Sequence, residues 1–260
     1  LVFWGSGIMK DSFVLCSTCW ITYNIYKIFI LRNKILLNFI ILIININIIL
    51  TIKPYIIISL VPGILFWLIN KSADTVKNKI IKILVYPFIV LSFLTAGYFI
   101  FSEFSAEMGV YGDVDSAIQQ AQVIQEDLLR EEQYGSNNYN IGELDGTTIG
   151  LIKIAPIAVF TALFRPLFYD IGSFTMLISA LENTILLFFL IFNLLKVSPY
   201  KLFKLISGDS FIGFCLTFSV LFAFGVGIAG TNFGALVRYK IPLMPFFFSS
   251  VYILSHKIKK

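Results

Sequence analysis

Long apolar runs alternate with short polar connections along most of the chain. Runs of this kind are typical of membrane-spanning helices, which need about 20 residues each. The pattern predicts an all-α, polytopic transmembrane bundle of about seven spans, the third and seventh of them short. The predicted spans are Ser12–Leu31, Ile35–Ile52, Tyr55–Ile69, Ile81–Phe101, Ser173–Leu195, Phe211–Gly230 and Ile241–Ser255.

Composition agrees with this pattern. Of 260 residues, 58% are hydrophobic and 13% are charged, and the mean hydropathy is +0.86. Soluble domains are about half apolar and about a quarter charged. The chain begins with Leu1 and has no basic segment typical of a signal peptide, so we expect an N-terminally truncated fragment whose earlier spans are missing.

One long connection breaks the alternation. Residues 102–150 are rich in Asp and Glu and contain a single basic residue, Arg130. Within them Ile118, Ala121, Ile124 and Leu128 recur three and four residues apart, which predicts an amphipathic helix. The chain is thus predicted to have four parts: a first helix group (1–101), an acidic loop (102–150), a connecting segment (151–172) and a C-terminal helix group (173–260).

The distribution of lysine and arginine predicts an orientation. Short loops rich in these residues stay in the cytoplasm. This rule predicts a multi-pass protein with the acidic loop outside and the C-terminus in the cytoplasm. The basic segments are Lys27/Arg32/Lys34, Lys71/Lys77/Lys79/Lys82, Lys196/Lys201/Lys204 and the tail Lys257/Lys259/Lys260.

The segment 151–172 does not fit as an eighth span. Another crossing there would reverse the side of the later basic loops. Only eleven residues separate Lys153 from Arg165, and Pro156 is one of them. Because about that many residues cannot cross a bilayer core of ~30 Å, we expect a re-entrant or interfacial helix on the outer face.

The predicted outer face carries bases that the orientation rule does not explain: Lys10, Lys53, Lys153, Arg165, Arg238 and Lys240. Three of them, Arg165, Arg238 and Lys10, are long enough to extend to lipid headgroups. Beside Pro166, Pro242 and Pro245, they also resemble the lining of an anion-binding vestibule, because the guanidinium fork suits phosphate. Glu182 is placed inside a span, as a structural ion pair, a protonated carboxyl or a catalytic group, with Arg165 as the expected partner.

Several familiar motifs lack the context that their chemistry requires. "GVGIAG" (Gly225–Gly230) ends an apolar helix and follows no strand, so close helix packing, or unwinding of the helix at the outer interface, is favoured over dinucleotide binding. "CSTC" (Cys16–Cys19) has no second cysteine pair. His256 is the single histidine, which argues against a catalytic triad or a histidine metal site. We expect no metal, no cofactor and no nucleic-acid partner.

Three predicted outer-face stretches carry a family resemblance: "FWGSGIMKD" (Phe3–Asp11), "FRPLFYD…SALEN" (Phe164–Asn183) and "NFGALVRYKIPLMPF" (Asn232–Phe246). They resemble bacterial membrane proteins of cell-envelope polysaccharide assembly, of the O-antigen or oligosaccharide repeat-unit polymerase type. The last stretch is also similar to multi-span glycosyltransferases that use polyprenyl-phosphate sugars. The chain lacks the N-terminal spans of such proteins, and no histidine lies on the predicted outer face.

The resemblance implies metal-independent transfer or polymerisation of a polyprenyl-pyrophosphate-linked glycan on the outer face. Membrane lipid and other polysaccharide-assembly proteins are the implied partners. Cationic groups would stabilise the leaving pyrophosphate, and a carboxylate would act as base. The candidates are Arg165, Arg238 and Lys10 for phosphate binding, Glu182 and Asp170 as base, and Asp11, Asn232 and Tyr239 as lining residues.

Two other functions remain open on the sequence. A transporter or flippase of a lipid-linked or anionic solute would use the same arginines for a moving substrate, with Glu182 relaying protons. Transporters often have repeated halves with broken helices, and no such repeat is visible. A non-catalytic membrane subunit is the third possibility.

Overall fold

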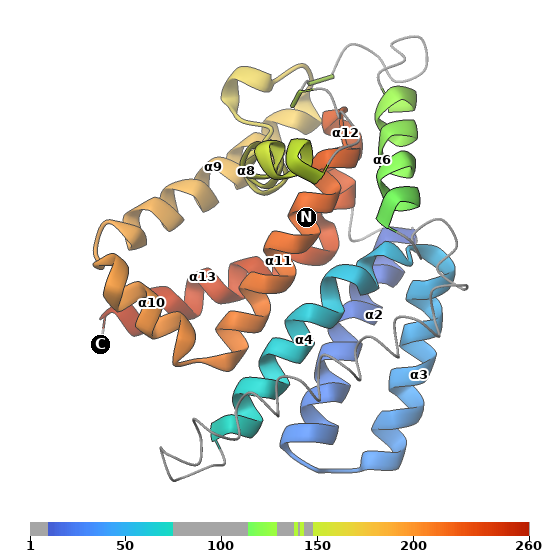
Figure 1. Ribbon diagram of the computed structural model, residues 1–260. Coiled ribbons are helices and arrows are strands. Elements are labelled where there is room, and N and C mark those ends of the chain that lie inside the picture. Colours follow the sequence, from blue (N-terminus) through green and yellow to red (C-terminus); the bar gives the residue numbers. More distant parts are fainter. Residues whose placement is uncertain (1–9, 75–113, 129–137, 140, 143–147, 260) are drawn as a thin grey trace.

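The protein is a bundle of long apolar helices in a computed structural model that describes residues 10–74, 114–128, 138–139, 141–142 and 148–259 (Figure 1). In the described residues, six helical stretches are long and apolar enough to cross a membrane. This confirms an integral membrane protein, and each stretch overlaps a predicted span. The remaining predicted span, Ile81–Phe101, and the stretch Phe3–Met9 lie outside the described residues.

The N-terminal helices stand side by side as antiparallel neighbours. They are α2 (Lys10–Ile25), which continues as a π-helical turn (Tyr26–Ile30), α3 (Ile35–Ile52) and α4 (Tyr55–Asp74). Polar residues on the buried face of α3 bond within their own helix: the Asn38 and Asn45 amides donate to the carbonyls of Lys34 and Ile41, at 2.9 and 2.8 Å. Their hydrogen-bonding groups are thereby partly satisfied without water.

The C-terminal helices follow the acidic loop. They are α8 (Thr148–Phe164), α9 (Phe174–Leu194), the short α10 (Pro199–Ser207), α11 (Ser210–Ala229), α12 (Phe233–Tyr239) and α13 (Met244–Lys259). Of the loop itself, the structure describes α6 (Val114–Leu128), which confirms the predicted amphipathic helix, and a few residues before α8. The rest of the loop lies outside the described residues.

The core is built around α11, which packs against α4, α8 and α13. Phe214, Phe218 and Phe222 are fully buried along one side of α11, and the ring centroids of neighbours lie 6.4 and 5.7 Å apart. Side chains of this size supply the packing contacts that hold helices together where lipid offers no hydrophobic contrast.

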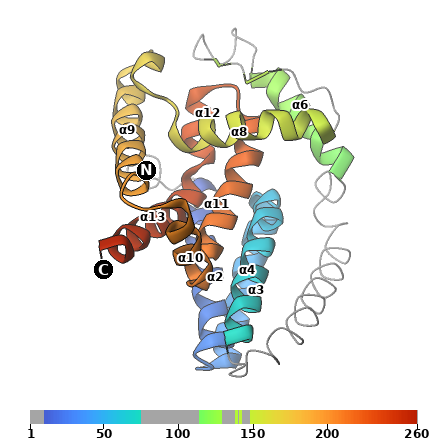
Figure 2. The same ribbon diagram turned by 60° about the vertical axis from the view of Figure 1, so that its left-hand side comes forward.

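Helix α8 lies across the bundle at one end of it rather than along its axis (Figures 1 and 2). It crosses α11 at a close backbone approach: a Cβ added to Gly227 would lie 2.2 Å from the carbonyl oxygen of Ala158. This confirms close packing as the role of Gly227 within "GVGIAG". At 17 residues with Pro156 inside, α8 is shorter than the six stretches above, and a re-entrant path stays a prediction.

The last apolar stretch is broken near its start. Instead of one helix from Ile241, the chain forms α12, a 3₁₀ turn at Ile241–Leu243 and then α13. Pro242 lies in the first turn of the 3₁₀ segment, where a missing N–H costs least. The break positions the polar residues of α12 at the end of the bundle.

The helices alternate between two ends. We call one the Asp11 end: α2 begins there, α3 joins α4, α9 begins and α11 leads into α12 (upper half of Figure 1). The other is the α10 end, which holds the α2–α3 turn, the end of α4, α10 and the end of α13. The described basic loops share the α10 end, as the charge pattern predicts, while the membrane side of each end stays a prediction.

Candidate functional site

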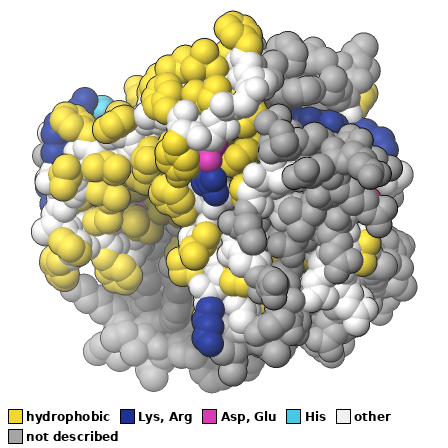
Figure 3. All heavy atoms as spheres, turned by 90° about the horizontal axis from the view of Figure 1, so that it is seen from above, with side chains coloured by type: hydrophobic (Ala, Val, Ile, Leu, Met, Phe, Trp, Pro, Cys, Tyr) yellow, Lys and Arg dark blue, Asp and Glu magenta, His cyan; other side chains and the backbone are white. Residues whose placement is uncertain are grey.

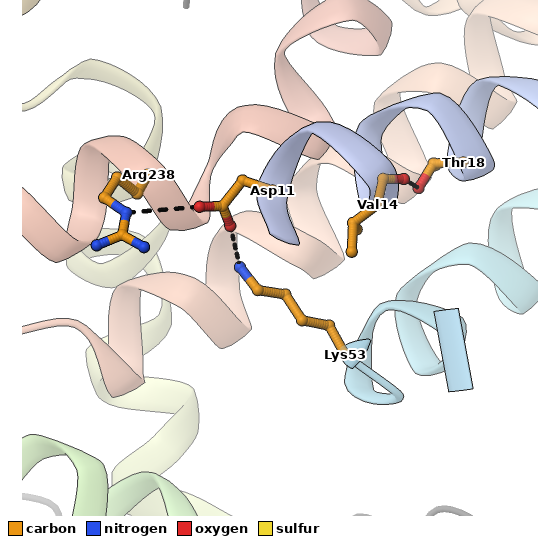
Figure 4. Close-up of polar contacts among 5 residues, drawn as sticks. All are labelled: Asp11, Val14, Thr18, Lys53 and Arg238. Atoms are coloured by element: carbon orange, nitrogen blue, oxygen red, sulfur yellow. Dashed lines mark hydrogen bonds and ion pairs between the residues drawn. The ribbon is translucent and has the colours of Figure 1, made fainter. Parts of the chain in front are cut away.

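A buried carboxylate gathers two cations from distant segments at the Asp11 end (Figure 4). Asp11 lies in the first turn of α2, where the helix dipole favours an anion, and its side chain is 2% exposed. The Lys53 Nζ lies 2.5 Å from Asp11 Oδ1, and the Arg238 Nε lies 3.4 Å from Asp11 Oδ2. Asp11 thus connects α2 with the α3–α4 connection and with α12.

The two cations differ in exposure. Lys53 is largely buried and lies over the Tyr239 ring, 4.8 Å from its centroid. Burial lowers the pKa of Lys53, and Asp11 opposes that shift. Arg238 is 45% exposed, and its terminal nitrogens point away from Asp11 and Lys53 in Figure 4. Arg238 is therefore the cation of this group that a ligand reaches most easily.

A second ion pair follows directly after α8. Asp170 accepts hydrogen bonds from Arg165 Nε at 3.0 Å and from Arg165 Nη2 at 2.5 Å. Its Oδ2 also accepts from the Leu167 amide at 2.9 Å. The cis Arg165–Pro166 peptide lies within this turn. The hydrogen bond to Asp170 raises the pKa of Arg165, so the guanidinium stays charged.

Aromatic rings surround the Arg165 guanidinium. Its central carbon lies 4.9, 5.3 and 5.8 Å from the ring centroids of Phe233, Tyr139 and Tyr169. These distances are in the range of cation–π attraction. Tyr139 is almost fully buried, and burial raises its pKa. Its hydroxyl has no hydrogen-bond partner among the described residues.

Lys240 connects the Arg165 turn to α9 from inside the protein. Its Nζ donates to the Arg165 carbonyl at 3.1 Å and to Asn183 Oδ1 at 2.8 Å, and Lys240 is 3% exposed. The Asn183 amide donates in turn to the Pro166 carbonyl at 3.1 Å. Lys240 is also within electrostatic range of Glu182. Buried polar groups are satisfied here by one another, as a low-dielectric site requires.

The acidic loop reaches this site at Asn138 and Tyr139. Asn138 and Asn232 form an antiparallel bridge, and the Asn232 amide donates to Asn138 Oδ1 at 3.0 Å. Asn232 Oδ1 accepts from the amides of Gly234 and Ala235, so the same side chain caps α12. The neighbouring Tyr139 packs on Phe233, with ring centroids 4.7 Å apart.

The structure brings most of the predicted site residues to the Asp11 end, but in different pairs from those expected. Arg165 pairs with Asp170, five residues along the chain. Glu182 is half-buried on α9 beside the Lys240–Asn183 contact. Lys10 is exposed, next to Asp11 and within electrostatic range of Lys53. The predicted roles of these residues stay predictions.

Sequence reasoning did not identify several members of the site. Lys53 and Lys240 were recognisable only as bases on the side predicted to be poor in bases. Asn183 and Tyr139 gave no signal of their own, because an amide in a span and a tyrosine in a loop are common. Asn183 closes the stretch "FRPLFYD…SALEN" that carried the family resemblance, but it was given no role there.

The described residues contain no cluster of three or more His, Cys, Asp or Glu that could hold a metal ion. Cys16, Cys19 and Cys215 are free thiols, on α2 and α11. The site combines fixed cations, carboxylates and aromatic rings. Such a set can bind an anion and exchange a proton.

Figure 3 looks onto this end and shows an acidic and a basic group side by side among hydrophobic side chains. Five basic residues and three carboxylates of the described part of the chain lie in this group. They are Lys10, Lys53, Arg165, Arg238 and Lys240, with Asp11, Asp170 and Glu182.

Comparison with known proteins adds no relative. No protein-family model, no curated protein and no solved structure matches the chain. What the sequence and the fold together establish is an integral membrane protein whose helices meet in a charged, aromatic-lined site at one end.

Proposed function

We propose that this protein transfers or polymerises a glycan carried on polyprenyl pyrophosphate at the outer face of the bacterial inner membrane. The observation that carries the proposal is the meeting of three distant stretches at one end of the bundle. Asp11, the Arg165–Asp170 turn and the Arg238–Lys240 segment belong to the stretches that resemble polysaccharide polymerases, and they contact one another. A membrane-embedded substrate with a phosphate headgroup would reach such a site from the lipid.

The reaction would join an acceptor hydroxyl to the anomeric carbon of the lipid-linked glycan. A new C–O bond forms, the bond from the anomeric carbon to pyrophosphate breaks, and its electron pair leaves with the pyrophosphate. The hydroxyl proton passes to a base. Positive groups fixed near the leaving oxygen stabilise the charge that develops there.

The geometry favours particular residues for these roles. Arg238 is the most exposed guanidinium of the site, and Lys10 adds a neighbouring positive charge, so these two suit the pyrophosphate. Both oxygens of Asp170 already accept hydrogen bonds from Arg165 or Leu167. Asp170 is therefore held within its turn, and Glu182, half-buried on α9, stays the other candidate for the base. Arg165 orders the turn through Asp170 and adds its charge to the site.

The test replaces Arg238→Ala in the full-length protein in the cells that make it, and measures the chain length of surface polysaccharide on gels. We expect short or absent polymer at unchanged protein abundance. Lys259→Ala, which removes an exposed charge from the tail, serves as the matched control and leaves polymer length unchanged.

Two results would contradict the proposal. Normal-length polymer in both Arg238→Ala and Arg165→Ala would show that these cations are not needed for transfer. Lipid-linked glycan retained on the cytoplasmic leaflet of the variants would show a defect in movement across the membrane, and hence a transporter.

A further inference from the structure

The short helix α10 exposes an unusual surface between two membrane-spanning stretches. The preceding stretch ends at Leu194 and the next begins at Ser210, so α10 lies at the level where both reach the membrane surface. Leu195, Tyr200 and Phe203 are 82%, 78% and 71% exposed. Apolar and aromatic side chains with such large exposed fractions indicate a surface that contacts a partner.

The helix has a second, inward face that fixes its orientation. Leu202, Leu205 and Ile206 are half-buried, and α10 packs against α11 and α13. At 100° per residue these three point to one side, so Tyr200 and Phe203 lie on the outward side. Ser198 caps the helix by accepting from the Lys201 amide at 3.3 Å. The helix is therefore attached to the bundle and presents its aromatic residues outward.

Basic side chains accompany these aromatic residues. Lys196, Lys201 and Lys204 are exposed, and Lys196 Nζ lies 3.7 Å from the centroid of the Phe192 ring. Residues 195–208 contain no Asp or Glu. The carboxylate that follows, Asp209, already binds Lys257, with Nζ 2.6 Å from Oδ2. The surface is therefore apolar and positively charged at once.

We propose that α10 lies in the membrane interface and binds the headgroups of anionic phospholipid. Tyr200 and Phe203 insert at the headgroup level, where aromatic residues are favoured. Lys196, Lys201 and Lys204 extend to the phosphates and attract acidic lipid. A soluble protein partner fits less well, because α10 is fixed to the ends of membrane-spanning helices.

The test uses the full chain in bilayer nanodiscs with a reporter at the proposed surface. Tyr200→Trp is tolerated because the side chain is mostly exposed. Its fluorescence, corrected for that of the parent chain, is measured with brominated phosphatidylglycerol or brominated phosphatidylcholine at equal fractions. We expect stronger quenching by the anionic lipid, and a smaller difference at high salt.

Charge removal tests the role of the lysines. In the reporter background, Lys201→Gln lowers the preference for phosphatidylglycerol over phosphatidylcholine about fivefold, and Lys201→Gln with Lys204→Gln lowers it further. Lys153→Gln removes an equally exposed charge from α8 at the other end and leaves the preference unchanged.

Two outcomes would overturn the proposal. Equal quenching by both lipids would show that α10 contacts lipid without selecting its charge. Quenching by neither lipid would show that the surface faces away from the bilayer, as it would if another protein covered it.

Discussion

The two ends of the bundle use positive charge in opposite ways. At the Asp11 end, Lys53 and Arg165 are mostly buried and each lies against a carboxylate. At the α10 end, Lys196, Lys201 and Lys204 stand exposed. Burying a cation is costly unless a partner compensates it, whereas an exposed lysine costs little. The comparison indicates that charges at the Asp11 end define a specific structure, while those at the α10 end define a surface.

The largest expected effect comes from removing Asp11. Asp11→Asn leaves Lys53 buried without its carboxylate and weakens the hold on Arg238. Breaking a buried ion pair by removing one partner costs about 3–5 kcal/mol. We expect a loss of that size in the free energy of unfolding, measured in mixed micelles by titration with denaturing detergent.

A double variant separates the charge effect from other damage. Asp11→Asn combined with Lys53→Met removes the uncompensated cation and recovers part of the loss. A loss below about 1 kcal/mol in the free energy of unfolding of Asp11→Asn would be typical of an exposed ion pair. The Asp11–Lys53 pair would then not distinguish this end of the bundle from the α10 end.

The second-largest effect is expected from Gly227→Ala, which tests the packing of α8 on α11 that positions the Arg165 turn. In Gly227→Ala the new Cβ would lie 2.2 Å from the backbone of Ala158, so α8 must move away from α11. Overpacking of this kind costs about 1–3 kcal/mol. Thermal unfolding of the purified protein measures it.

Gly225→Ala is the matched control, because nothing lies within 4 Å of its added Cβ. We expect no loss there, or a gain of up to about 1 kcal/mol from helix propensity. Equal effects of the two substitutions would mean that α8 is not held by close contact at Gly227.

The smallest effect is expected at the α10 end, in Asp209→Asn. Burial raises the pKa of Asp209, but hydrogen bonds from Lys257 and from the amides of Ile212 and Phe211 outweigh it, and the pKa lies below its ordinary 3.8. Asparagine still caps α11. The loss is therefore that of a partly exposed pair, about 0.2–1 kcal/mol at neutral pH.

The sign of the pH dependence follows from the lowered pKa. The folded carboxyl holds its proton less tightly than the unfolded one, so its contribution to stability is complete above the ordinary pKa and is lost as the pH falls through the folded value. Unfolding measured between pH 6 and about pH 3 should therefore bring the parent and Asp209→Asn together. A difference that stays constant over this range would contradict an ionic origin.

The helices could be predicted from sequence because their signal is local. Apolar runs mark six described stretches, and the spacing of Ile118, Ala121 and Ile124 marks α6. The break in the last apolar stretch near Lys240 was predicted less well. The prolines were noted, but the sequence did not show that α12 would form a separate short helix before Pro242.

The partners in the site could not be predicted in the same way. Loop charges indicated that Asp11, Arg165 and Arg238 share one side of the membrane, but a pairing depends on which helices are neighbours. Glu182 was the expected partner of Arg165, and the sequence did not indicate that Asp170, in the same turn, would bind it. Lys53 was noted as an unexplained base, but a single lysine between apolar runs carries no sign of its partner.

Asn232 has a mechanical consequence. One amide side chain both holds Asn138 of the acidic loop and caps α12. The seven residues of α12 begin at Phe233, against Arg165, and reach Arg238, against Asp11. A displacement of the loop at Asn138 is therefore transmitted to the first turn of α12, whose last turn carries the exposed Arg238 guanidinium. While the Asn232 side chain keeps both contacts, the loop and α12 move together.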